Sequence, residues 1–171
     1  HSPIGFYAGG GDPLPFITDS EGRVRVQDEG SQLAALALSR AEPVRAGERW
    51  LDLCAGPGGK AAVLAAEALL GGAVLEANEV SHTRARLVRG SLIGIPGGVE
   101  VSEEDGRSRA GAAQYDRILV DAPCTGLGAL RRRPEARWRK LPSDIPELTA
   151  LQSELAEAAF AALVPGGILG Y

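Results

Sequence analysis

The sequence reads LDLCAGPGGKAA over residues 51–62, and this stretch decides the fold. Apolar residues lead into a loop of small residues, and an Ala- and Leu-rich segment follows it. We therefore expect a strand over Arg49–Leu53, a glycine-rich turn, and a helix over Gly58–Leu70 that Gly71 and Gly72 end. Glycines let the backbone approach a ligand closely, and the first turn of a helix offers it free N–H groups.

The spacing of the glycines in this loop indicates which class of ligand it could bind. Residues 56–61 fit the pattern G-x-G-x-x-A of dinucleotide-type loops, and the acid expected about 20 residues later is present as Glu79. A P-loop is excluded, because that motif needs glycine where Cys54 stands and Ser or Thr where Ala61 stands. The alternative is that the glycines serve only a tight turn.

The rest of the chain alternates strands and helices around this unit. This alternation predicts an α/β fold with a doubly wound, mostly parallel sheet over residues 23–171. Residues 1–22 are predicted to be a linker or N-terminal arm, the Gly- and Pro-rich first twenty without regular structure. We expect further strands over Arg23–Gln27, Ala73–Ala77, Val99–Val101, Arg117–Val120 and Gly167–Tyr171, and helices over Glu29–Ala41, Ser81–Ile93 and Glu147–Leu163.

The composition is that of one soluble globular domain. The 171 residues are 44% hydrophobic and 23% charged, which excludes collagen-like and disordered chains. No apolar run reaches the roughly 18 residues that span a bilayer, and residues 1–12 lack the features of a signal peptide. Two cysteines are too few for a disulfide framework, so we expect the cytoplasm. Without a methionine, the chain is interpreted as part of a longer protein.

Positive charge is concentrated in one segment of a chain whose net charge is −4. Six of the 18 basic residues fall within ten positions, with Glu135 as the only acid among them and Trp138 interleaved. Arginine and an aromatic ring can contact phosphates and stack on bases, so this segment is a candidate RNA contact. The alternative is a solvated basic loop. The basic residues are Arg131, Arg132, Arg133, Arg137, Arg139 and Lys140.

A second loop, DAPCTGLG over residues 121–128, follows the strand predicted at Arg117–Val120. In a doubly wound sheet this strand lies beside Arg49–Leu53, and ligands bind in the crevice between them. We therefore expect Asp121 and Cys124 beside the glycine loop. Cys124 is a candidate nucleophile or acid–base group, since a Pro/Gly-rich loop at the end of a strand is not core.

Two more residues have both a functional and a plain structural interpretation. Cys54 continues an apolar strand, which favours a small buried hydrophobe over a reactive thiol. Asp105, in the triplet DGR, follows the strand at Val99–Val101 and could accept a hydrogen bond from an adenine amino group. An Asp-Gly turn is the alternative.

Taken together, these motifs resemble those of the S-adenosylmethionine-dependent RNA cytosine-5 methyltransferases of the Fmu/Sun type. The resemblance extends from Val26 to Tyr171. It rests on QDEGSQL at 27–33, LDLCAGPGGK at 51–60, NE at 78–79, DGR at 105–107, DAPCTGLG at 121–128, RRRP at 131–134, RW at 137–138 and PGG at 165–167.

The resemblance implies a Rossmann-like class I methyltransferase domain and assigns roles to its loops. It implies that Glu79 holds the ribose of the methyl donor, that Asp105 lies near its adenine and Asp121 near its methionine end. A cytosine of ribosomal or transfer RNA would be flipped out next to Cys124, with the basic segment on the RNA side. The implied donor loop comprises Cys54, Ala55, Gly56, Pro57, Gly58, Gly59 and Lys60.

The resemblance also implies a division of labour between two cysteines. In this family the attacking cysteine lies in a Thr-Cys pair just after the fifth strand, which would fall beyond Tyr171. Cys124 is tied to release of the RNA adduct, so Cys124 and Asp121 are the catalytic residues expected within this chain. The last two strands of the fold would also follow Tyr171, and this fragment alone is predicted to be inactive. We expect no metal, and the oligomeric state is left open.

Two other functions remain open at this stage. A nicotinamide-dependent oxidoreductase can use the same glycine loop, but it would leave residues 121–128 and the arginine run unexplained. An RNA-binding remnant that has lost its nucleophile is the second alternative.

Overall fold

A five-stranded parallel sheet forms the centre of the computed structural model, which describes residues 1–7, 10–20, 23–111, 113–130, 134–139 and 141–171. The strand order β3-β2-β1-β4-β5 places the first strand in the middle, paired on both sides. This order confirms the predicted doubly wound α/β fold. The strands are β1 (Arg49–Asp52), β2 (Val74–Asn78), β3 (Glu100–Ser102), β4 (Tyr115–Leu119) and β5 (Leu163–Gly170).

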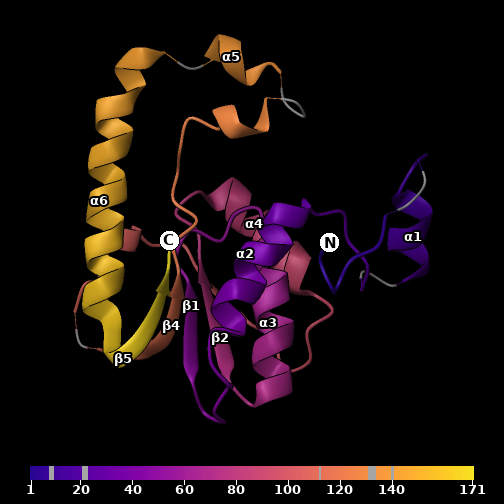
Figure 1. The fold of residues 1–171 in the computed structure, drawn as a ribbon, viewed down its shortest axis with the longest axis horizontal. Helices are drawn as coiled ribbons and strands as arrows, with labels where there is room; N and C mark the ends of the chain where they lie inside the picture. The colour runs from indigo at the N-terminus through magenta and orange to yellow at the C-terminus, as the bar shows by residue number, and fades with distance from the viewer. Residues whose placement is uncertain (8–9, 21–22, 112, 131–133, 140) are drawn as a thin grey trace.

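Helices cover both faces of the sheet (Figure 1). One face packs against α2 (Glu29–Ser39), α3 (Gly59–Gly71) and α4 (His82–Leu92), and the other packs against α6 (Ile145–Ala162). The alternation of side chains along β1 divides the two cores, because Trp50 belongs to the first cluster while Leu51 and Leu53 belong to the second. Asp52 therefore shares the α2/α3 face with Trp50.

Short elements complete the described chain. They are α1 (Leu14–Asp19), α5 (Ala136–Arg139) and the 3-10 turns η1 (Gly106–Arg109), η2 (Leu127–Ala129) and η3 (Pro142–Asp144). Among the described residues, no helix has the length and apolar character needed to cross a membrane.

Two predicted local structures are wrong. The first twenty residues do contain regular structure, because α1 forms after Pro13, and the Thr18 hydroxyl donates a hydrogen bond to the Leu14 carbonyl. The strand expected over Arg23–Gln27 does not form. Its alternating residues find no strand to pair with, and Arg25 instead donates to the Gly90 carbonyl of α4.

The other predicted elements are present with shifted ends. The helix α6 begins at Ile145, two residues before the predicted start, because Pro146 fits the first turn of a helix. The strand β5 begins at Leu163 rather than Gly167, since Leu163 pairs with Tyr115 before a register irregularity.

A buried arginine joins α2 to the sheet. Arg117 of β4 is 1% exposed, and its Nε donates to Glu48 Oε2 at 2.9 Å. Its Nη1 donates to the carbonyls of Leu38 and Ser39 at the C-terminal end of α2, at 3.2 and 2.7 Å. The guanidinium also lies 4.9 Å from the Trp50 ring. This network satisfies helix-end carbonyls that would otherwise be buried without donors.

Replacing Arg117 with Leu should cost about 3–5 kcal/mol in the free energy of unfolding, because it removes the buried cation of the Glu48 carboxylate and leaves only the exposed Arg45 to pair with it. Urea denaturation measures this loss. The matched control is Arg49→Leu on the neighbouring strand, whose exposed guanidinium packs on the Tyr115 ring and should cost about 1 kcal/mol or less. Equal losses in the two variants would contradict the buried-pair interpretation.

Candidate functional site

The candidate site lies where the parallel strands end. Residues 53–59 link β1 to α3, Glu79 follows β2 directly, and Asp121 comes two residues after β4. Because β1 is paired with both β2 and β4, these three segments meet at the same edge of the sheet.

The glycine loop is held against Glu79 and α4. The Gly56 N–H donates to Glu79 Oε2 at 3.1 Å, and the Ser91 hydroxyl donates to the Pro57 carbonyl at 3.2 Å. A Cβ at Gly56 would lie 2.2 Å from Glu79 Oε2. A Cβ at Gly58, where φ is +108°, would lie 2.6 Å from Ser91 Cβ. Both glycines are thus required by packing within the protein.

Glu79 is buried at this corner, and both of its carboxylate oxygens accept a hydrogen bond. It is 3% exposed, and its Oε1 accepts a hydrogen bond from the Ser81 N–H at 2.9 Å. Arg84 of α4 forms an ion pair with Oε2 at 3.4 Å and also donates to the Gly56 carbonyl. Glu79 is therefore fixed against the glycine loop with Arg84 as its cation. The half-exposed Arg84 side chain lies on the corner where the ribose is expected.

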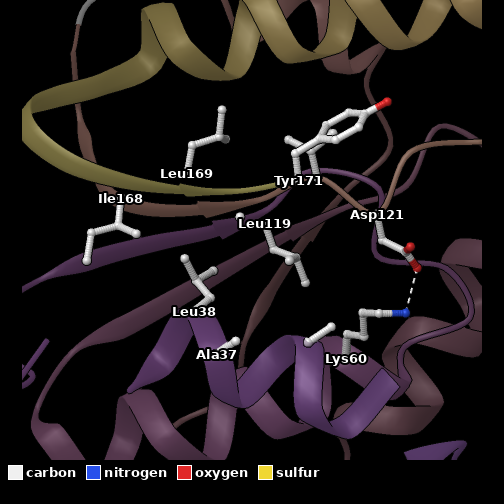
Figure 2. A pocket seen from close by; sticks show the side chains of 11 residues that line it. Ala37, Leu38, Lys60, Leu119, Asp121, Ile168, Leu169 and Tyr171 are labelled. Carbon is white, nitrogen blue, oxygen red and sulfur yellow. Dashed lines mark hydrogen bonds and ion pairs between the residues drawn. The ribbon is translucent and has the colours of Figure 1, made fainter. Parts of the chain in front are cut away.

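A second ion pair joins the glycine loop to the loop after β4. Lys60 Nζ lies 2.7 Å from Asp121 Oδ2 (Figure 2). It also lies 3.2 Å from the Ser31 hydroxyl of α2. Asp121 is about half exposed, whereas only 18% of the Lys60 side chain is. The sequence prediction that Asp121 lies beside the glycine loop is thus confirmed. The pair borders a hollow of about 390 Å³ whose other walls come from α2, β4 and β5.

Asp52 is the last residue of β1, and its carboxylate is buried. It is 0% exposed, and neither side-chain oxygen accepts a hydrogen bond of ordinary geometry within the described part of the chain. Burial, followed by the negative charge of Asp121, raises the pKa of Asp52 to about 7. The Lys60 ammonium and the Cys54 N–H oppose this shift only in part.

The two cysteines lie in different surroundings. Cys124 is exposed, and the Gly126 N–H donates to its Sγ at 3.4 Å. Its loop is anchored by α6, because Gln152 Nε2 donates to the Pro123 carbonyl at 2.8 Å. Cys54 packs against the apolar cluster under α6, and burial raises the pKa of its thiol to about 12. Cys54 is thus a poor thiolate, while Cys124 is accessible.

Asp105 is placed after β3 by a buried amide. Asn78 donates to the carbonyls of Leu53 and Glu104 at 3.1 and 3.0 Å, so it ties the end of β1 to the Asp105 loop. Hydrogen bonds from the Arg107 side chain and backbone lower the pKa of Asp105 to about 2. Asp105 is thus an ionised, half-exposed acid that caps η1. Its predicted contact with an adenine stays a prediction.

Only part of the basic segment falls within the described residues. Arg137 and Trp138 belong to α5, are exposed, and stack with 5.9 Å between the guanidinium and the ring centroid. Trp138, at 81% exposed, is not a core residue. The Arg139 backbone also lies in α5, whereas residues 131–133 and 140 lie outside the described residues.

Sequence reasoning missed three residues of this site. Asp52 and Asn78 look like ordinary ends of strands, and Arg84 looks like one of several arginines on an exposed helix. A polar side chain at the last position of an otherwise apolar strand was the available signal for the first two. Nothing in the sequence distinguishes Arg84 from Arg86 or Arg89, because its partner Glu79 becomes its neighbour only when α4 folds back on the sheet.

Comparison with known protein families identifies this arrangement. The model of the 16S rRNA methyltransferase RsmB/F family matches residues 40–171. The chain belongs to this family. Members of the RsmB/F family are S-adenosylmethionine-dependent RNA methyltransferases, so the resemblance noted from the sequence motifs is confirmed.

Curated relatives agree with the RsmB/F assignment. The putative methyltransferase MT1451 of Mycobacterium tuberculosis (strain CDC 1551 / Oshkosh) is 51% identical over the whole chain, which covers 37% of that relative. Ribosomal RNA small subunit methyltransferase B of Serratia proteamaculans (strain 568) is 38% identical over 92% of this chain and 36% of its own length. The chain thus spans little more than a third of these relatives.

Solved structures support the RsmB/F fold. The crystal structure of PH0851 superposes with a TM-score of 0.81 at 33% identity, over 94% of this chain and 36% of the other. The structure of a methyltransferase homologue protein from Pyrococcus horikoshii gives a TM-score of 0.69 at 29% identity, over 92% of this chain and 49% of the other. These similarities confirm the Rossmann-like methyltransferase architecture.

The glycine loop generates a stability prediction. Gly58→Ala should lower the free energy of unfolding by roughly 1–3 kcal/mol, because the added Cβ clashes with α4 at a left-handed backbone position. Gly59→Ala is the matched control. Its Cβ would approach only the flexible Gln27 side chain, at 3.3 Å, so the change should be within about 0.5 kcal/mol. Urea denaturation of both variants tests this, and equal stabilities would contradict the packing role of Gly58.

Asp52 generates a pH-dependence prediction. Its folded pKa of about 7 lies above the ordinary value of 3.8, so the folded state holds the proton more tightly. Protonated Asp52 therefore contributes fully to the free energy of unfolding below about pH 4. This contribution, about 4 kcal/mol in total, is lost as the pH rises through about 7.

The test compares urea denaturation of the native protein and Asp52→Asn at pH 5, 6, 7 and 8. The variant should gain stability relative to the native protein as the pH rises. Asp19→Asn, an exposed change in α1, should follow the native profile. Parallel profiles for all three proteins would show that Asp52 does not titrate in this range.

Proposed function

We propose that the protein containing this chain transfers a methyl group from S-adenosylmethionine to C5 of a cytosine in ribosomal or transfer RNA. The observation that carries the proposal is the Lys60–Asp121 ion pair, which joins the glycine loop of an RsmB/F methyltransferase domain to the start of the loop that contains the exposed Cys124. We place this activity in the cytoplasm, where exposed thiols such as Cys124 stay reduced.

The residues at the sheet edge suit the methyl donor. The loop at 54–60 leaves no side chain between its backbone and Glu79, whose carboxylate would receive the ribose hydroxyls. Asp105 would face the adenine and Asp121 the methionine end, each from a loop that follows a strand. When bound, the donor supplies an electrophilic methyl group on a cationic sulfur.

The chemistry at cytosine explains why such an enzyme would need a cysteine near the methyl donor. C5 is a poor nucleophile until a thiolate adds to C6, and the C5 proton must leave before the thiolate is eliminated. The resemblance assigns the attack to a cysteine after the fifth strand and assigns release to Cys124. The exposure of the Cys124 thiol, on a loop anchored by Gln152, supports such a role for it, whereas Cys54 is unsuited because its thiol stays protonated.

RNA contact is proposed for the segment after the Cys124 loop. Arg137 and Trp138 present a cation and a ring to solvent, and the same stretch of sequence contains Arg131, Arg132, Arg133, Arg139 and Lys140. Phosphate contacts of this kind position an RNA without reading its sequence. A base within an RNA helix would also have to be extruded to reach the site.

Tritium release tests the proposed reaction in the whole protein. Ribosomal RNA labelled as [5-³H]cytosine is incubated with S-adenosylmethionine, and transfer to C5 should release tritium to water in step with methylation. Methylation without release would place the methyl group on another atom. No methylation of ribosomal or transfer RNA, together with RNA binding, would favour the RNA-binding remnant.

The role of Cys124 is tested in the same assay. Cys124→Ala should retain the first methyl transfer and accumulate a covalent protein–RNA adduct, visible as a shifted band on a denaturing gel. Ser153→Ala, an exposed small-residue change on α6, should turn over without an adduct. Loss of methyl transfer without an adduct in Cys124→Ala would instead make Cys124 the attacking nucleophile.

A further inference from the structure

The carboxylates at the ends of the central strands do not all have a cation. Glu79 is paired with Arg84 at 3.4 Å, and Asp121 is paired with Lys60 at 2.7 Å. Asp52 belongs to the same edge, yet within the described chain its carboxylate has no ion pair and no hydrogen bond of ordinary geometry, and the Cys54 N–H is the one backbone donor that acts on it. This corner of the domain therefore lacks one positive charge whenever Asp52 is ionised.

Asp52 lies where bulk solvent does not reach its carboxylate. In the sheet it lies between Ala77 of β2 and Leu119 of β4, both of which are buried. It shares the face covered by α3, whose buried Ala61 and Leu64 pack in the same cluster as Ala77 and Leu119. A buried carboxylate in such a layer must hold a proton or gain a nearby cation.

The two forms of the family's cofactor differ by the required charge. The sulfur of S-adenosylmethionine is a sulfonium and carries a positive charge. The sulfur of S-adenosylhomocysteine, left after transfer, is a neutral thioether. A site with one uncompensated carboxylate distinguishes these two molecules by charge alone, although their shapes differ by one methyl group.

We propose that Asp52 is the titratable counter-charge of this site, releasing its proton when the cationic methyl donor binds and recovering one when the neutral product remains. This inference rests on the proposed use of S-adenosylmethionine by this chain. Asp52 acts through the field it shares with Lys60 and Asp121, so it is a positioning residue rather than a catalytic one. Donor binding is then coupled to the release of a proton to solvent, and methyl transfer, which leaves the neutral product in the site, is coupled to its recovery.

The charged groups around Asp52 make the exchange possible near neutral pH. Asp121, from the loop after β4, and Glu79, from the loop after β2, disfavour its ionised form, as burial does. Lys60 of α3 and the Cys54 N–H favour the ionised form. Burial and the two carboxylates outweigh the Lys60 ammonium and the Cys54 N–H, so Asp52 holds a proton that it loses near neutral pH, and an added positive charge at the edge favours that loss.

Isothermal titration calorimetry tests the proposal with S-adenosylmethionine and S-adenosylhomocysteine as the probes. Titrations at pH 7 in phosphate and in Tris, which differ in ionisation enthalpy, count the protons exchanged. Binding of S-adenosylmethionine should release about half a proton, and S-adenosylhomocysteine should release none. The affinity ratio of the two ligands should shift about tenfold in favour of S-adenosylmethionine between pH 6 and pH 8.

Asp52→Asn separates this role from a structural one. The variant keeps the size of the side chain but cannot ionise, so it should bind both ligands with no difference in proton release and a flat affinity ratio. Asp19→Asn, far from the site in α1, should behave like the native protein. A flat ratio in the native protein, or the native slope retained in Asp52→Asn, would overturn the proposal.

The same titrations separate failure of this inference from failure of the proposed function. If neither ligand binds the native protein, the proposed cofactor of this chain is wrong, and the proposed role of Asp52 is wrong as well. If both ligands bind with equal proton exchange, the cofactor assignment stands and the counter-charge role of Asp52 is wrong.

Discussion

The central position of β1 is the constraint on which the rest of the structure depends. Its backbone is hydrogen-bonded to β2 on one side and to β4 on the other, in parallel on both. All three strands must therefore end at the same edge, and the loops that follow them come together there. The glycine loop, Glu79 and Asp121 meet because of strand direction, although 42 residues separate the last two in the sequence.

Charge at that edge is held by residues from several elements. Arg84 on α4 stabilises Glu79, and Lys60 on α3 links Asp121 to Ser31 of α2. The position of α2 depends in turn on Arg117, which binds its C-terminal carbonyls from within the sheet. Removing the charge of Arg117, far from the glycine loop, can therefore alter the site. Arg117 holds α2 in place, and α2 contributes the Ser31 hydroxyl that contacts Lys60.

The glycine loop acts as a packing unit as well as a candidate ligand cradle. Gly56 leaves room for the Glu79 carboxylate, and Gly58 leaves room for α4 at a backbone angle that other residues adopt with strain. From the sequence, the glycines could serve either close approach of a ligand to the backbone or a tight turn. The geometry requires them for the turn whether or not a ligand binds. Loss of donor binding in a variant of Gly58 would thus have to be separated from loss of packing.

The sequence by itself determined the order of strands and helices, the glycine loop, the Cys124 loop and the family, because these depend on local patterns of apolar, small and chemically distinctive residues. It missed α1, predicted a strand over Arg23–Gln27 that does not form, and assigned no role to Asp52, Asn78 or Arg84. Only the tertiary structure decided that Lys60 pairs with Asp121, that Arg84 pairs with Glu79, and that Asp52 is buried without a partner. The physical reason is that pairing and burial depend on distances between residues far apart in the chain, which are set when the strands align and the helices pack over them.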